Sequence, residues 1–303
     1  MKKLLIIALG LAFTATSFAQ TKPAPGNTKP APTNAAHAAD SVAQAYDRPL
    51  DGYYTKTNFE ERKVTPYPNL RQADVIFAKR VWREIDVREK MNQYLASPKS
   101  RLIDVLMAAI DAGELTAYDP TPNPAKGDPS GDAFSTPLTG GQAKARMADS
   151  AVVDQFDADG NKIGSRVQAG EFNPDSVIKF RIKEDWVFDK QRSVFEPRII
   201  GIAPLIRFQV EGLETDYQPA FWVYFPEARQ VLATKEAVSR NNDATGLSFD
   251  DVFLKRLFSS YIVKASNEKD ERIKDYAQGI DRLYESERIK KSLMDWELTL
   301  WQY

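Results

Sequence analysis

The stretch SVIKFRIKEDWVFDK, residues 176–190, constrains the fold more than any other part of this chain. Ile178, Phe180 and Ile182 alternate there with three cationic residues, a period of two that is typical of a β-strand with one solvent-facing side. A turn-forming KQRSV segment follows, and then two further apolar segments, EPRIIGIAPLIRFQV and AFWVYF. Sequential strands at this spacing favour antiparallel pairing. We therefore expect an antiparallel sheet over about residues 150–225.

Helical patterns precede this predicted sheet. Residues 73–95, ADVIFAKRVWREIDVREKMNQYL, place apolar residues at helical spacing, and we predict a charged amphipathic helix there. A second helix is predicted from Ser97, with Pro98 in its first turn, to a stop at Gly113. LTAYD, residues 115–119, is predicted to be a short strand, and residues 142–150 a short helix.

Helical patterns also follow the sheet. Ser248 and Asp251 form a capping-box-like start for a helix predicted to run through residue 266. Beyond it, one or two charged helices are expected, with Ile273, Tyr276, Ile280 and Tyr284 on one face, and Ile289, Leu293, Trp296 and Leu300 on another. The predicted fold class is therefore α+β, an antiparallel sheet flanked by N-terminal and C-terminal helices.

Two loop segments raise questions of function. Residues 120–141 contain nine Pro or Gly residues in 22 and predict a long surface loop. FDADGNKIG, residues 156–164, resembles a calcium loop, but a loop starting at Asp157 would place Lys162 where glycine is required and Gln168 where glutamate is required. Apolar residues flank Asp-Gly-Asn, so we interpret this segment as a β-hairpin turn.

The beginning of the chain predicts export. A basic start, an apolar run and small residues before the boundary Ala19–Gln20 are typical of a signal peptide over residues 1–19. Residues 20–46 are rich in Pro, Ala and Thr and predict a disordered tether. Residues 47–303 are expected to form a single α+β domain, with an aromatic-rich arm over residues 47–70 lying on its surface. No other segment approaches the length of a membrane span, so we expect no direct membrane insertion.

Composition limits the chemistry of the predicted domain. There is no cysteine, and the single histidine, His37, lies in the predicted tether. We therefore expect no His- or Cys-dependent catalysis, no metal site and no cofactor. Removal of Lys2 and Lys3 with the signal leaves 39 basic against 42 acidic residues, a net charge of −3, which does not favour nucleic acid as a partner.

Three stretches together resemble the gliding-motility GldN family, called PorN in non-gliding relatives. They are ADVIFAKRVWREIDVREKMN (73–92), KEDWVFDKQRSVFEPRIIGIAPL (183–205) and NNDATGLSFDDVFLKRLFSSYIVKASN (241–267), and the tail YAQGIDRLYESERIKKSLMDWELTLW agrees with them. The resemblance covers roughly residues 47–303. It implies a periplasmic component of the type IX secretion system, associated peripherally with the outer membrane.

The resemblance also implies partners. Members of this family are associated with a ring built with a GldK/PorK-type lipoprotein, in contact with the periplasmic part of a GldM/PorM-type motor protein. Aromatic and arginine residues dominate protein interfaces. On that basis we predict interface residues in two places: Trp82, Arg83 and Arg88, and the segment that contains Trp186, Phe188, Arg192, Phe195 and Arg198.

Two other functions are kept open. A carboxylate-dependent periplasmic glycan hydrolase would need two convergent acids, such as Glu184 with Asp185 or Asp250 with Asp251. Adjacent strand residues point to opposite faces, which argues against the first pair, and helix capping explains Asp251. A peptidoglycan- or ligand-binding module is the second alternative, since exposed Trp and Tyr rings stack on sugars.

Overall fold

A computed structural model describes residues 58–148, 150–156, 162–169, 172–207, 209–210, 213–238 and 246–300, together with residue 53. The predicted signal peptide, the whole of the predicted tether and the turn of the 156–164 hairpin lie outside the described residues. The α+β class with an antiparallel sheet and helices, including a C-terminal helix, is confirmed.

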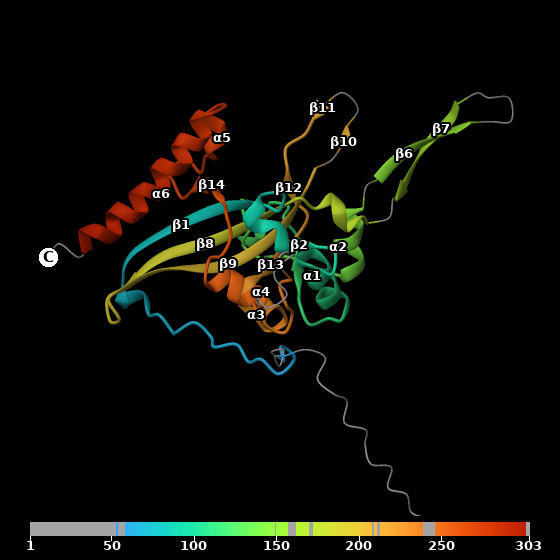
Figure 1. Cartoon of the computed structure of the whole chain (residues 1–303). Coiled ribbons are helices and arrows are strands. Elements are labelled where there is room, and N and C mark those ends of the chain that lie inside the picture. Colours follow the sequence, from blue (N-terminus) through green and yellow to red (C-terminus); the bar gives the residue numbers. More distant parts are fainter. Residues whose placement is uncertain are drawn as a thin grey trace, which may run out of the picture. The chain divides into compact units, whose positions relative to one another are not determined.

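An eight-stranded sheet forms the centre of the fold (Figure 1). Its order is β14-β1-β8-β9-β13-β4-β5, with β12 paired to β9, and each of these pairings is antiparallel. The strands are β1 (Val75–Asp86), β4 (Ala117–Tyr118), β5 (Pro137–Leu138), β8 (Lys179–Asp189), β9 (Val194–Ile206), β12 (Gln218–Pro219), β13 (Trp222–Tyr224) and β14 (Tyr261–Ala265). The sheet thus includes strands that lie before and after the predicted range of residues 150–225.

Strand β1 corrects the helix predicted over residues 73–95. The segment is a 12-residue strand that pairs with β8 on one side and β14 on the other, followed by a short 3-10 helix over Lys90–Leu95. Its apolar residues fit both a helical and a two-residue period, and Phe77, Val81 and Ile85 all lie on one side of the strand. The segment forms a strand because it pairs with a strand on each side, and such tertiary context often overrides local helical propensity.

The register of β1 and β8 defines two faces of the sheet. Ile85 lies opposite Phe180 and Arg83 opposite Ile182, and we call the face that carries these four side chains the helix face. Trp82 lies opposite Lys183 on the other side, which we call the loop face. Odd- and even-numbered residues of these two paired strands therefore lie in two different environments.

The main core packs against one end of the helix face. Helices α1 (Leu102–Asp111), α3 (Phe225–Ala233) and α4 (Phe249–Leu254) contribute to it, and α2 (Gly140–Met147) packs against α1. Fully buried aromatic and aliphatic side chains fill it, including Phe180, Phe221, Phe225, Phe249 and Phe253. The predicted Ser248–Asp251 capping box is confirmed at the start of α4.

The helix predicted through residue 266 ends early. After the C-cap Lys255, Arg256 takes φ +52°, a left-handed conformation that terminates a helix. The chain then enters β14 at Tyr261, where the β-branched pair Ile262 and Val263 favours a strand. This segment is corrected from helix to strand.

A second hydrophobic cluster lies beside β1 and the edge strand β14. Short helix α5 (Ile273–Tyr276) and long helix α6 (Asp281–Leu300) pack beside β14 (Figure 1). Val81, Ile262, Ile273 and Leu293 are buried together there. The hydroxyl of Ser286 on α6 accepts the Ile262 backbone N–H at 2.8 Å, which fixes the helix along the outer edge of the sheet.

The described part of the predicted arm, residues 58–70, does lie over the domain. Arg62 pairs with Asp251 at 2.5 Å, and Arg229 donates to the Thr65 carbonyl at 2.9 Å. Arg198 donates to the Pro68 carbonyl at 3.0 Å, so side chains from three elements hold an otherwise irregular segment. The prediction of an arm is confirmed over these residues.

Smaller elements complete the described structure. The predicted hairpin around residues 156–164 is present as β6 (Ser150–Phe156) paired with β7 (Lys162–Ala169). Two further two-stranded ribbons join β2 (Ala96–Ser97) to β3 (Ser100–Arg101) and β10 (Gln209–Val210) to β11 (Leu213–Glu214). The remaining 3-10 turns cover Gln72–Asp74, Pro124–Lys126 and Pro174–Ser176. Within the described part of the chain, no helix is long and apolar enough to cross a membrane.

Candidate protein-interaction surface

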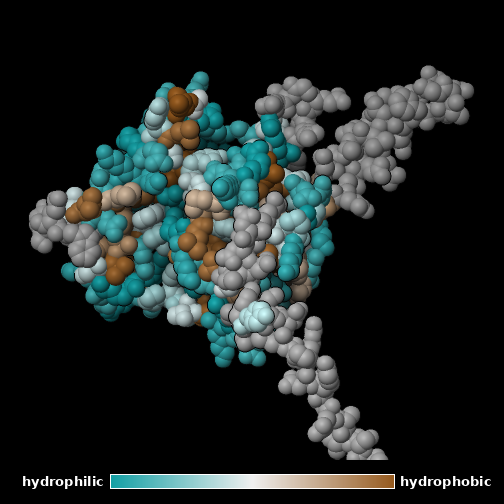
Figure 2. Space-filling model, in the orientation of Figure 1, coloured by the Kyte–Doolittle hydropathy of each residue, from teal (hydrophilic) through white to brown (hydrophobic). Residues whose placement is uncertain are grey.

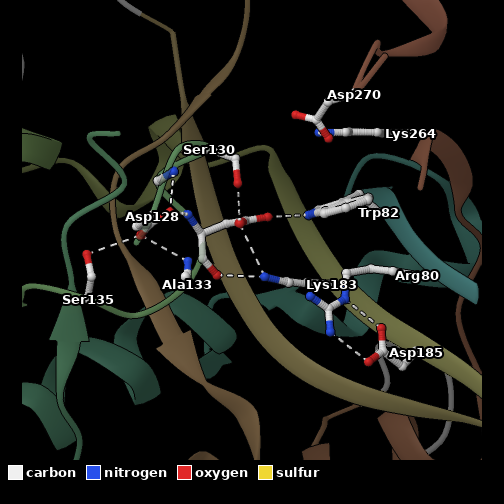
Figure 3. A network of polar contacts seen from close by, with 12 residues as sticks. Arg80, Trp82, Asp128, Ser130, Ala133, Ser135, Lys183, Asp185, Lys264 and Asp270 are labelled. Atoms are coloured by element: carbon white, nitrogen blue, oxygen red, sulfur yellow. Dashed lines mark hydrogen bonds and ion pairs between the residues drawn. The ribbon is translucent and has the colours of Figure 1, made fainter. Parts of the chain in front are cut away.

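Trp82 belongs to a polar network on the loop face (Figure 3). Its ring is buried, and its indole N–H donates to the Asp132 carboxylate at 2.7 Å. Lys183, also buried, pairs with the same carboxylate at 3.2 Å and donates to the Asp132 carbonyl at 2.8 Å. The structure therefore places Trp82 under the 120–136 loop, where it holds that loop to the sheet.

Asp128 gives the loop its shape. Its buried carboxylate accepts the backbone N–H groups of Gly131, Asp132 and Ala133 at 2.6 to 3.0 Å and the Ser135 hydroxyl at 3.2 Å (Figure 3). Gly131 adopts φ +75°, and a Cβ there would lie 1.9 Å from the Pro120 carbonyl oxygen, so only glycine fits. The Pro- and Gly-rich segment is thus a loop whose conformation is fixed by hydrogen bonds and which covers Trp82 on the sheet.

Arg83 and Glu184 form a buried ionic cluster with Arg256. Glu184 has no exposed surface and accepts hydrogen bonds from Arg83 at 2.6 Å and from Arg256 at 2.8 Å. The Trp186 indole N–H donates to the same carboxylate at 2.9 Å. Two of the predicted interface residues, Arg83 and Trp186, therefore meet at one internal carboxylate.

The electrostatics of Glu184 follow from this cluster. Burial raises the pKa of Glu184, but attraction to Arg256 and Arg83 and the hydrogen bonds of Arg256 and Trp186 outweigh it, so the pKa lies below its ordinary value. Glu184 is therefore held as a carboxylate. A general acid needs the opposite, a raised pKa.

The other candidate acids are engaged in the same way. Asp185 lies on the loop face, opposite in direction to Glu184, and pairs with Arg80 at 2.7 Å. Asp250 pairs with buried Arg229 at 2.9 Å, and Asp251 caps α4 while pairing with Arg62. These contacts assign all four carboxylates to structural pairing and remove the observation that motivated a glycan hydrolase.

An aromatic cluster lies near the turn that joins β8 to β9. Phe77 stacks on Trp296 of α6 with ring centroids 4.1 Å apart, and Phe195 lies 5.7 Å from Phe77 and 5.4 Å from Trp186. Phe188 pairs in register with Phe195 and is half-buried. Of the predicted aromatic residues, Trp186 and Phe195 thus come together, and Phe77 connects them to Trp296 of α6.

The predicted arginines remain nearer the surface. Arg192 bridges Asp189 and Glu196, each at 2.7 Å, and Arg198 shares Glu196 at 2.9 Å. Arg88 keeps 64% of its side chain exposed and pairs with Asp86 at 2.5 Å. The structure does not bring Arg88 next to the 186–198 segment, because Arg88 follows the opposite end of β1. The interface role of these eight residues stays a prediction.

The outer face of α5 and α6 carries a surface that the interface prediction did not include. Tyr276, Ile280, Leu283, Tyr284, Met294 and Leu298 each expose more than half of their surface, and we call this set the outer helix face. Figure 2 shows hydrophobic side chains at the outer end of this helical layer. The sequence placed Ile273, Tyr276, Ile280 and Tyr284 on one helical face, and this prediction is wrong for Ile273. Ile273 is buried beside Leu293, whereas the other three residues point to solvent.

The described residues contain no group of three or more His, Asp and Glu side chains arranged to hold a metal ion. The arginines and aromatic rings described above make contacts within the domain. The outer helix face exposes apolar side chains to solvent. The fold is that of an α+β protein with a large antiparallel sheet and a C-terminal helix. Residues 70–302 match the family model described as gliding motility associated protein GldN, and the chain belongs to that family. No curated protein matches the chain.

Proposed function

We propose that this chain is a non-enzymatic structural subunit of the gliding motility and type IX protein secretion machinery. In this role it works in the periplasm, forms a ring with a GldK/PorK-type outer-membrane lipoprotein and contacts a GldM/PorM-type motor protein. The observation that carries the proposal is the family match over residues 70–302. Attachment to the outer membrane comes through the lipoprotein partner.

The outer helix face is the surface that we assign to the lipoprotein. Ile280, Leu283 and Tyr284 expose 62%, 56% and 65% of their surface within two turns of chain. A contiguous apolar patch rimmed by charge is typical of a protein contact site. Helix α6 is well suited to present it, because Leu293, Ile289 and Trp296 anchor its opposite side.

Co-expression with the neighbouring lipoprotein, mild detergent extraction and electron microscopy test the proposal. We expect a high-mass ring that contains both proteins. The double variant Leu283→Glu, Tyr284→Glu should lose the lipoprotein, because it places two charges in the contact. Ser292→Glu is the control, since it adds a charge at an exposed position of the same helix that points away from Leu283, and it should keep the complex.

Recovery of the chain only as a free monomer would contradict the assembly role. Retention on purified cell wall in the absence of the lipoprotein would instead favour a peptidoglycan-binding module. A complex that survives the double variant would leave the ring in place and refute the assignment of the outer helix face.

A further inference from the structure

Two adjoining cavities lie on the loop face of the sheet, with volumes of about 590 and 370 Å³. Arg181, Asp216, Tyr217, Val263, Arg272 and Lys274 line both cavities, so the two form one groove. The 120–136 loop, β14 and the segment that contains α5 form its walls. Leu283 of the outer helix face also lines the smaller cavity, so the groove borders that face.

Most charges along the groove are neutralised by partners within the chain. Asp132 pairs with Lys183, Asp216 with Lys274, and Asp270 with Lys264. Arg146 pairs with Asp119 at 2.7 Å. Apart from Asp275, whose carboxylate accepts the Arg272 backbone N–H at 2.8 Å, each described acidic residue that lines the groove is therefore paired with a cation.

Two guanidinium groups differ from this pattern. Arg181 donates from one terminal nitrogen to Glu84 at 2.5 Å, yet its buried Nε is the single buried side-chain nitrogen or oxygen among the described residues that has no hydrogen-bond partner. Exposed Arg272 lines the same groove, and its guanidinium makes no ion pair with any described residue. An unsatisfied buried donor is costly, and a ligand oxygen would satisfy it.

The local field agrees with an anionic ligand. The hydrogen bond from Lys274 lowers the pKa of Asp216, and the charges of Arg282 and Arg272 lower it further. The whole chain carries a net charge of −1, so general attraction of anions to the protein surface is not expected. Binding of an anion to the protein would therefore indicate a local site such as this groove.

The walls indicate a ligand larger than a free ion. Trp82, Trp222 and Tyr217 contribute aromatic surface, and Pro120, Pro122 and Pro219 contribute rigid apolar surface. A cavity of about 590 Å³ is within the range that encloses an organic ligand. Guanidinium groups recognise planar carboxylates through paired hydrogen bonds.

We propose that this groove binds an acidic peptide segment, with a side-chain carboxylate held by Arg181 and Arg272. The inference does not depend on the proposed assembly role, because it is tested on the isolated full chain without the lipoprotein.

Fluorescence anisotropy with fluorescein-labelled hexaglutamate tests the proposal. We expect saturable binding, no binding of labelled hexaglutamine, and a loss of affinity of about tenfold in Arg272→Gln. Arg288→Gln is the matched control, because Arg288 is exposed, pairs with Glu285 and lies outside the groove. Nitrogen-15 NMR of the arginine side chains should show a shift of the Arg181 Nε–H resonance on binding.

Three results would overturn the proposal. They are the absence of saturable hexaglutamate binding, equal weakening by Arg272→Gln and Arg288→Gln, and displacement of the peptide by inorganic phosphate at an equal concentration, which would assign the groove to a free oxyanion. The NMR measurement locates the ligand without any substitution, so a folding defect in a variant does not decide the outcome.

Discussion

Glu184 shows how adjacent residues in one strand can have unrelated roles. Its carboxylate is buried between two arginines, whereas its neighbour Asp185 forms a pair with Arg80 that keeps 27% and 42% of the two side chains exposed. Removing one member of a buried ion pair leaves the charge of its partner buried, with neither a counter-charge nor water to stabilise it. An exposed pair loses little, because solvent already screens it.

We predict that Glu184→Gln lowers the free energy of unfolding by about 3 kcal/mol, since Arg83 and Arg256 would lose their shared counter-charge in a buried site. Asp185→Asn should cost less than about 1 kcal/mol. Urea denaturation followed by circular dichroism measures both values. Equal destabilisation by the two variants would show that the buried cluster has no special role.

The residue scale also shows what sequence reasoning can say about the candidate site. It selected Arg83, Trp186 and Phe195 from their chemical type, and the structure brings Arg83 and Trp186 to one carboxylate and Trp186 to Phe195. It did not identify Glu184 as the common partner of Arg83 and Trp186, nor Arg181 as an unsatisfied donor. Both facts depend on three-dimensional neighbours that are distant in sequence.

At the scale of elements, local signals predicted the parts of the fold that local chemistry controls. The alternation in β8, the capping box of α4 and the stop at Gly113, which has φ +74°, are all present. The errors at β1 and β14 have a different origin. Each segment has apolar residues that fit a helix, and each becomes a strand because it pairs with a neighbour that lies far away in sequence.

Helix α6 offers a matched test of which of its sides packs. Leu293 is 4% exposed and Leu298 is 61% exposed, on the same helix. We predict that Leu293→Ala releases α6 from β14 and costs about 2 to 4 kcal/mol, while Leu298→Ala changes stability by less than about 0.5 kcal/mol. Hydrogen exchange of the Ile262 amide, which Ser286 covers, reports the release. Unchanged protection in Leu293→Ala would contradict the packing described.

At the scale of the whole molecule, buried carboxylates make stability depend on pH. Burial raises the pKa of Asp132, but attraction to Lys183 and hydrogen bonds from Ser130 and Trp82 outweigh it, so this pKa is lowered, as is that of Glu184. A carboxylate whose pKa is lower in the folded state stabilises the fold above its unfolded pKa. That contribution is lost as the pH falls toward the folded value.

We therefore predict that these two carboxylates contribute their full stabilisation above about pH 5 and progressively less below about pH 4, where the unfolded chain takes up protons first. Thermal unfolding between pH 3 and 7 measures the effect. Glu184→Gln should flatten the acid dependence, because it removes one of the two carboxylates. Stability that increases on acidification would contradict the assignment.

The two ends of the main sheet are closed to further strands. At one end, the Ser286 hydroxyl occupies the outward Ile262 N–H and α6 runs alongside β14. At the other, β5 is only two residues long, and Pro137 has no N–H to offer. A neighbouring copy therefore cannot extend this sheet by backbone pairing. An assembly that contacts these two edges must therefore use side-chain contacts, which single substitutions can disrupt one at a time.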